Sequence, residues 1–302
     1  SGGFDFCRTA EPAHKLHFIN GLRRQKGVHT CDSSVTAESV STLIDGGRGQ
    51  SARSYRQEKN VKKYVVTASL LAGLSMVSGA AFAQTAGSVG ANFTKIDTDF
   101  GDADSYGVDG EVIIPTGGSW SALLEAAFND SDDTDGAIEG AAHLINNGGN
   151  NAWGGFIGAA DSDDSTSFVV GGEYAQFFDA STLAFNVNYA TNDDTDVDAY
   201  GLNGAYRIFA SDNLRFDLGA SIARAEAGGN DADIYTLGAG VEYRFDNSPF
   251  SIGAAYTRAD GDFAEADIFG ITARWNFGDE TLKQADRKGS TFTGLGNALQ
   301  GF

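Results

Sequence analysis

The sequence has little cysteine, histidine or proline. Among 302 residues there are two cysteines, four histidines and three prolines. Both cysteines, Cys7 and Cys31, lie in the first 83 residues, as do three of the histidines. From Gln84 onward the chain has no thiol, and His143 is its only histidine. This composition excludes disulfides, cysteine nucleophiles, redox pairs and zinc fingers from residues 84–302.

Positive charge is also scarce. Residues 84–302 hold 10 lysines and arginines against 35 aspartates and glutamates. A nucleic-acid-binding surface needs basic side chains to neutralise phosphates, so we exclude nucleic acid as a partner. Glycine is abundant, with 40 residues, but it follows no three-residue period, which excludes collagen.

Residues 61–83 have the pattern of a secretory signal peptide. Lys62 and Lys63 precede a mostly apolar run over 64–77, and Ala81-Phe82-Ala83 is an A-x-A cleavage site before Gln84. The chain has one methionine, Met76. We therefore expect translation to start at Val61 and residues 1–60 to be translated upstream sequence. A transmembrane helix over 64–83 is the alternative, disfavoured because the run is short and rich in small residues.

The rest of the chain alternates apolar and polar residues with a period of two, which is typical of strands with one apolar and one polar face. Leu183, Phe185, Val187 and Tyr189 show it most clearly, alternating with small and polar residues. The pattern predicts twelve strands, at 87–96, 105–115, 119–129, 136–146, 151–160, 166–177, 182–191, 198–209, 213–225, 233–245, 250–259 and 267–277.

The connections between these segments also alternate. Every second connection is long and acidic, and this set holds 22 acids between Asp97 and Asp267. The intervening short connections hold three: Asp179, Asp212 and Asp246. An up-and-down meander places alternate connections at the same end. We therefore expect one acidic rim and one tight-turn rim.

Three observations place the apolar face against lipid rather than in a dry core. The opposite face is small or polar, as in a wet lumen. Aromatic residues gather toward both ends of the apolar face, as in the girdles at membrane interfaces. The segments also match the 9–11 residues that a tilted strand needs to cross a bilayer. The sequence therefore predicts a transmembrane antiparallel up-and-down β-barrel of about twelve strands.

Over residues 84–277 the chain resembles the porin-like outer-membrane β-barrels of Gram-negative bacteria. The last segment, FGITARWNF, is similar to the closing strand of that family, with alternating Phe269, Ile271, Ala273, Trp275 and a final Phe277. The resemblance implies recognition by the barrel-assembly machinery, extracellular acidic loops and short periplasmic turns. Residues 278–302 depart from it as an additional tail, which we expect to be periplasmic or lumenal.

Charged residues fall on the inward face of several segments. Acids come from the second, third, fourth and sixth segments, and arginines from the eighth, ninth, tenth and twelfth: Glu111, Glu125, Glu139, Glu173, Arg207, Arg215, Arg244 and Arg274. One interpretation is a field across a pore that favours small hydrophilic solutes, which resembles the constriction of general porins. The other is a network of ion pairs that ties the strands together and closes a narrow barrel.

The acidic rim suggests divalent cations. Clustered carboxylates suit Ca²⁺ or Mg²⁺, which would bridge to lipopolysaccharide phosphates. Asp130, Asp132, Asp133 and Asp135 are the weak candidates for such a site, but their spacing is not that of an EF-hand. We expect no resident cofactor.

The leading function is passive diffusion of small hydrophilic solutes through an outer-membrane channel, in a monomeric or homotrimeric barrel. A non-conducting structural or adhesion barrel with surface-exposed acidic loops is the alternative. An outer-membrane phospholipase would need Ser, His and Asn on the lipid face, whereas His143 has inward parity, so we expect no enzymatic activity.

Overall fold

The computed structural model describes residues 85–292 except 100, 132–133, 163–164, 193, 263–264 and 279–280. The expected signal peptide and upstream sequence lie outside these residues. The described part forms twelve strands: β1 (Ala86–Thr98), β2 (Gly101–Gly117), β3 (Trp120–Ser131), β4 (Thr134–Asn147), β5 (Asn151–Ser162), β6 (Ser165–Phe178), β7 (Ser181–Asn192), β8 (Val197–Ser211), β9 (Leu214–Ala227), β10 (Asn230–Arg244), β11 (Phe250–Gly261) and β12 (Glu265–Phe277).

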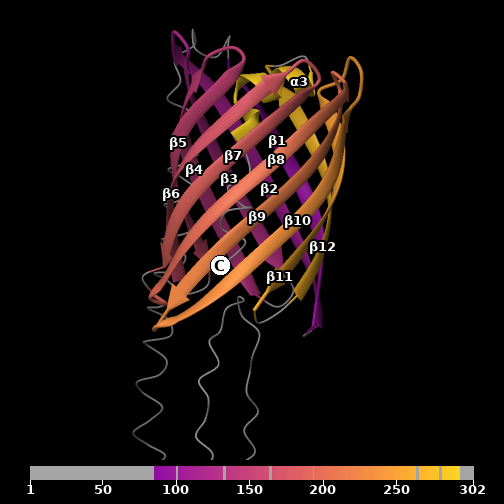
Figure 1. Cartoon of the computed structure of the whole chain (residues 1–302). Coiled ribbons are helices and arrows are strands. Elements are labelled where there is room, and N and C mark those ends of the chain that lie inside the picture. Colours follow the sequence, from indigo (N-terminus) through magenta and orange to yellow (C-terminus); the bar gives the residue numbers. More distant parts are fainter. Residues whose placement is uncertain are drawn as a thin grey trace, which may run out of the picture.

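The strands form one closed antiparallel barrel in which each strand pairs with its neighbours in the sequence (Figure 1). The barrel closes where β1 pairs with β12, from Gly87 opposite Phe277 to Thr98 opposite Ala266. Closure leaves no strand edge unpaired, as a sheet in a bilayer requires. The predicted fold, an up-and-down barrel of about twelve strands, is confirmed.

The strand boundaries differ from those expected at the acidic rim. Each predicted strand is present, but β2 begins at Gly101 rather than 105, and β10 at Asn230 rather than 233. Cross-strand ion pairs lie at these extensions: Lys95 on β1 contacts Asp102 on β2, and Arg224 on β9 contacts Asp231 on β10. Much of the acidic sequence therefore lies in paired strand, because pairing of opposite charges stabilises a hairpin there.

The two faces of the barrel have the predicted chemistry. Leu237 and Val187 point outward and are 68% and 57% exposed, although both are aliphatic. Asn188, the neighbour of Val187, points inward and is 8% exposed. An aqueous protein would not expose a continuous apolar belt of this kind, so the outer face contacts lipid.

Aromatic side chains lie near both ends of this outer face. Phe250 and Trp275 are exposed and paired near the tight-turn rim, and Tyr256 and Phe269 are exposed and paired near the acidic rim. Two such bands match the two interfaces of a membrane. Among the described residues, no helix combines the length and apolar character needed to cross a membrane.

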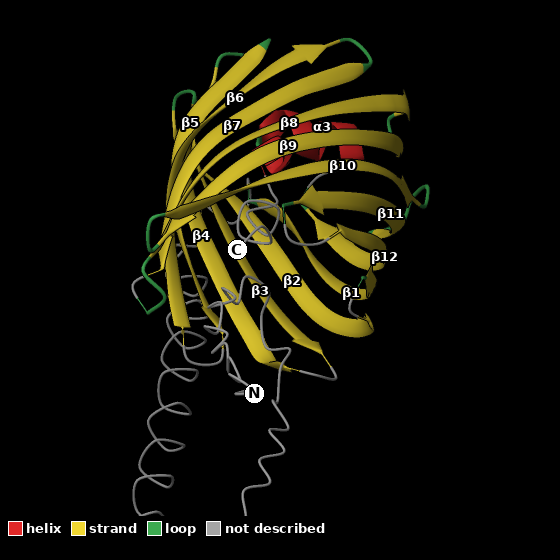
Figure 2. Cartoon of the chain, turned by 60° about the horizontal axis from the view of Figure 1, so that its bottom comes forward, coloured by secondary structure: helices red, strands yellow, loops and turns green. Residues whose placement is uncertain are grey.

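A short helical segment follows the last strand. It consists of α3 (Leu282–Lys288) and the 3₁₀ helix η1 (Ser290–Phe292). Figure 2 shows α3 within the ring of strands rather than outside it. A helix of seven residues is too short to be stable alone in water, so its contacts with the barrel hold it in place.

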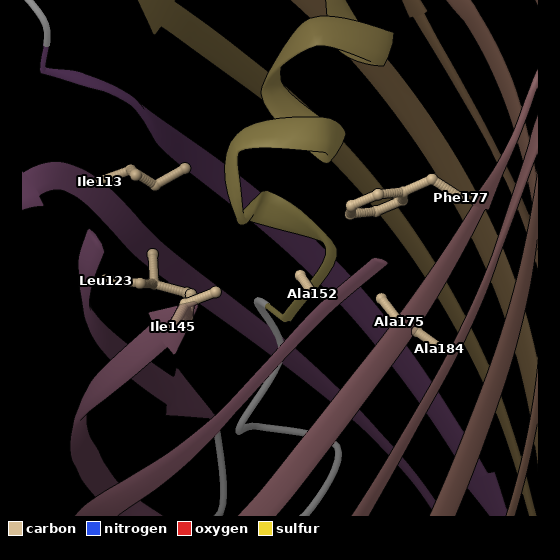
Figure 3. Packing of buried hydrophobic residues seen from close by; sticks show 7 residues of the cluster. All are labelled: Ile113, Leu123, Ile145, Ala152, Ala175, Phe177 and Ala184. Atoms are coloured by element: carbon tan, nitrogen blue, oxygen red, sulfur yellow. The ribbon is translucent and has the colours of Figure 1, made fainter. Parts of the chain in front are cut away.

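One part of the lumen is apolar, contrary to the expectation of a uniformly small and polar lining. The buried cluster comprises Ile113, Leu123, Ile145, Ala152, Ala175, Phe177 and Ala184, from β2 to β7. Figure 3 shows these side chains around the C-terminal helical segment. Phe292 packs against them. The expectation was wrong here because it did not include a second element that covers the wall.

Candidate functional site: the charged interior of the barrel

Two of the predicted inward acids meet at His143, which is 3% exposed on β4. Its Nδ1 atom lies 3.0 Å from Glu173 Oε2, and its Nε2 atom lies 3.2 Å from Glu125 Oε1. The contact with Glu173 is a hydrogen bond, whereas the one with Glu125 is aligned only for an ion pair. The ring stacks on Phe156, with centroids 5.2 Å apart.

This arrangement ties three strands together. A histidine with a carboxylate beside each ring nitrogen is most stable as the imidazolium, which here donates a hydrogen bond to Glu173 and attracts Glu125 by charge. The positive charge offsets the repulsion between Glu125 and Glu173. His143 therefore belongs to the inner wall, and it does not reach the lipid face where a phospholipase-like triad would need it.

The other two predicted acids have different surroundings. Glu111 accepts hydrogen bonds from Ser88 Oγ at 3.2 Å and from Ser290 Oγ of the C-terminal segment at 2.9 Å. Glu139 is partly exposed inside the barrel, near Glu125 and Asp109. Within the part of the chain that the structure describes, Glu139 has no hydrogen-bond or ion-pair partner.

The predicted arginines lie on the opposite wall, but acids accompany them. Arg215 contacts Asp217 Oδ2 and Glu242 Oε2, both at 3.0 Å. Arg207 lies 3.5 Å from Asp217 Oδ1 and 2.9 Å from Asp286 Oδ1 of α3. These contacts form a chain of alternating charges from α3 across β8 and β9 to β10.

The last two arginines are also held. Arg274 on β12 lies 2.5 Å from Asp109 Oδ2 on β2, a contact that reaches over β1 between them. Arg244 is buried, and its Nε donates to the backbone carbonyl of Ser248 at 3.0 Å. The acids and arginines thus occupy opposite walls, and ion pairs neutralise most of the arginine wall.

Asp217 and Glu242 belong to this charged interior but are not among the site residues predicted from the sequence. Asp217 lies two positions after Arg215, and Glu242 two positions before Arg244, so each shares the inward parity of an arginine. Parity alone could have found them. Asp286 could not have been found in this way, because it lies beyond the last strand.

The candidate cation site on the acidic rim lies mostly outside the described residues. Asp130 is exposed near the end of β3, and the side chains of Asp132, Asp133 and Asp135 lie outside the described residues. Among the residues that are described, no group of three or more potential ligands is placed to hold a metal ion.

The closed barrel with an apolar outer belt is an outer-membrane β-barrel, the one sheet architecture that satisfies its backbone polar groups within a bilayer. No family model matches the chain. No curated protein matches it either.

Several solved structures have a similar barrel. One is an outer-membrane channel from Pseudomonas putida F1, 10% identical, with a TM-score of 0.49 over 64% of this chain and 95% of that one. Another is the KdgM porin in complex with disordered oligogalacturonate, 8% identical, with a TM-score of 0.45 over 62% and 99%. A third is a loop-deletion mutant of the outer-membrane protein OmpT of Vibrio cholerae, 14% identical, with a TM-score of 0.41 over 64% and 98%.

Proposed function

We propose that the protein is an outer-membrane channel through which small hydrophilic solutes diffuse passively. The observation that carries the proposal is Glu139, an inward carboxylate without a partner among the described residues. Burying a charge without a partner in a dry interior is very unfavourable. Glu139 is partly exposed inside the barrel, and water at its level is the best explanation for an inward carboxyl group that no described residue pairs.

The wall around the middle of the barrel supports water there. Asn186 accepts hydrogen bonds from Asn188 at 3.1 Å and from Asn203 at 2.7 Å. Ser221 and Thr236 form a hydroxyl pair on the neighbouring strands. The amide and hydroxyl groups on this wall can form hydrogen bonds with polar solutes. The glycines between them have no side chains and so leave space in the lumen. Twelve strands are intermediate between barrels filled by side chains and barrels with a wide aqueous channel.

The charge of the interior favours cations over anions. Glu139 is partly exposed and has no neutralising partner in the described part of the chain. By contrast, Arg207, Arg215 and Arg274 are paired with acids, and Arg244 is buried against the Ser248 carbonyl. The acidic rim adds negative potential at one mouth. Small cations and neutral polar solutes are thus the class that the interior admits most readily, and apolar solutes are disfavoured.

Single-channel recording of the refolded chain in planar bilayers tests the proposal. We expect discrete conductance steps and a reversal potential of the sign for cation selectivity under a KCl gradient. A silent bilayer both for the unmodified chain and after release of the C-terminal helical segment, with circular dichroism showing an intact barrel, would contradict the channel.

A second candidate is a closed structural or adhesion barrel. The ion pairs on the arginine wall and the helix inside the barrel favour it, because both fill space in the lumen. The same recordings separate the two functions when they are repeated on the variants described below, in which the C-terminal segment is released.

A further inference from the structure

The chain turns into the barrel directly after its last strand. Gly278 follows Phe277 with a φ of +79°, and a Cβ atom at Gly278 would lie 2.1 Å from the carbonyl oxygen of Thr85. Only glycine fits this close approach and this backbone conformation. Residues 281–292, here called the C-terminal segment, include α3, which lies within the ring of strands (Figure 2).

A buried carboxylate fixes the C-terminal segment to the wall. Asp286 is 0% exposed, accepts a hydrogen bond from Thr182 Oγ1 at 2.6 Å, and lies 2.9 Å from Arg207 Nη1. A buried charge is stable only when it is paired and hydrogen-bonded. Both oxygens of Asp286 are satisfied by β7 and β8, so this position is specific rather than a loose collapse into the lumen.

Further polar contacts hold the C-terminal segment to strands on other sides of the barrel. Ser290 donates to Glu111 on β2, and the carbonyl of Arg287 accepts from Asn147 on β4. The guanidinium of Arg287 donates to the carbonyl of Phe178 on β6 and lies 4.9 Å from the Phe177 ring centroid. Contacts to β2, β4, β6, β7 and β8 show that the segment extends across the interior.

An apolar contact completes the attachment. Phe292 packs on the lumenal cluster that contains Leu123 and Ile145. Gly289 ends α3 with a φ of +139°, and a Cβ atom there would lie 3.1 Å from Ile145 Cδ1. The wall therefore matches the segment in shape, in charge and in apolar surface.

We propose that the C-terminal segment is a built-in plug that closes the barrel near its tight-turn rim, with Asp286 as its main anchor. This inference rests on the proposed channel function. Two of the residues expected to line the pore, Glu111 and Arg207, bind the plug in this structure. The plug therefore occupies the charged region that a solute would have to cross.

The plug predicts that weakening its anchor opens the channel. Asp286→Asn removes the charge that pairs with Arg207 but leaves Arg207 beside Asp217, so the barrel wall keeps its ion pair. Phe292→Ala removes the apolar contact independently. The matched control is Asp246→Asn, which removes an aspartate from the tight-turn rim whose recorded partner is Asn213, a barrel residue.

Two measurements on the full chain report separately on release of the plug and on conduction through the barrel. We expect trypsin to cleave after Lys283, Arg287 and Lys288 faster when the segment leaves the barrel, and mass spectrometry detects the products. Loss of a charged hydrogen bond should accelerate this cleavage about tenfold in Asp286→Asn. Single-channel recording should then show a higher open probability in both variants, with Asp246→Asn behaving like the unmodified protein.

Three results would overturn the plug. Unchanged cleavage in both variants would show that Asp286 and Phe292 do not hold the segment. Faster cleavage with the same non-zero conductance as the unmodified protein would show that the segment does not obstruct passage. Silence of every variant, even after trypsin removes the segment, would reject the channel function and the closing role together.

Discussion

His143 on β4 and Glu173 on β6 form a buried hydrogen bond of 3.0 Å across the strand between them. The contact is possible because Gly154 on β5 has no side chain at the point where they meet. A Cβ atom on Gly154 would lie 2.5 Å from the carbonyl oxygen of Leu144 and 3.0 Å from Glu173 Oε1. The side chains of His143 and Glu173 thus link β4 to β6, in addition to the backbone hydrogen bonds that each of these strands makes with β5.

Removing the histidine should destabilise the barrel. His143→Ala leaves Glu125 and Glu173 without their shared cation, and we expect the free energy of unfolding to fall by about 3 kcal/mol. Urea titration in lipid vesicles, followed by tryptophan fluorescence, measures the change. In His143→Ala/Glu173→Gln the second substitution should restore part of the loss; a purely additive double variant would contradict the coupling.

Filling the gap on β5 should have a related effect. In Gly154→Ala the new methyl group meets backbone, which cannot move aside as a side chain can, so we expect a loss of about 1–3 kcal/mol. Gly172→Ala is the control, since its Cβ would find no atom closer than Gly154 O at 3.9 Å. Equal stability of the two variants in the same titration would refute the steric account.

Because the outer belt faces lipid, an added charge should lower the free energy of unfolding more at mid-membrane depth than at the membrane surface. Leu237→Arg places a guanidinium in the lipid-facing part of β10, and we expect a loss of about 2–4 kcal/mol. Asn230→Arg, at the exposed end of the same strand, should cost less than about 1 kcal/mol. Folding titrations in bilayers measure the free energy of unfolding of both variants. A similar loss at both positions would mean that the belt does not face hydrocarbon.

The unpaired acid inside the barrel should set the ion preference. Glu139→Gln removes a negative charge from the lumen, so we expect the cation-to-anion permeability ratio to fall about twofold. Glu226→Gln removes the same charge from the acidic end of β9, where Glu226 contacts Arg224, and serves as the control. Reversal potentials under a KCl gradient report both. If the glutamine at position 139 leaves the potential unchanged, Glu139 does not line the conducting path.

The period-two pattern was enough to predict the strands, because Leu183, Phe185 and Val187 can lie on one face of the sheet only if the segment is extended. It also placed Glu125 and Glu173 on the inner face. It could not show that His143 joins them, because contacts across neighbouring strands depend on register, and register is set by pairing between segments.

The C-terminal segment shows where prediction from local pattern ends. Seven residues of α3 carry no periodic signal strong enough to distinguish a helix from a loop, and the helix is stabilised by partners such as Thr182, 104 positions away. Likewise, Ile113 and Phe177 belong to an apolar part of the inner wall, on which Phe292 packs. Both features arise from tertiary contacts alone.

The pairing of β1 with β12 has a consequence for biogenesis. These two strands are the first and the last to be synthesised, so until Phe277 has emerged the growing sheet has two free edges, each offering unsatisfied amide and carbonyl groups to any other extended chain. Synthesis that stops before β12 should therefore yield not a smaller barrel but a ribbon prone to aggregate.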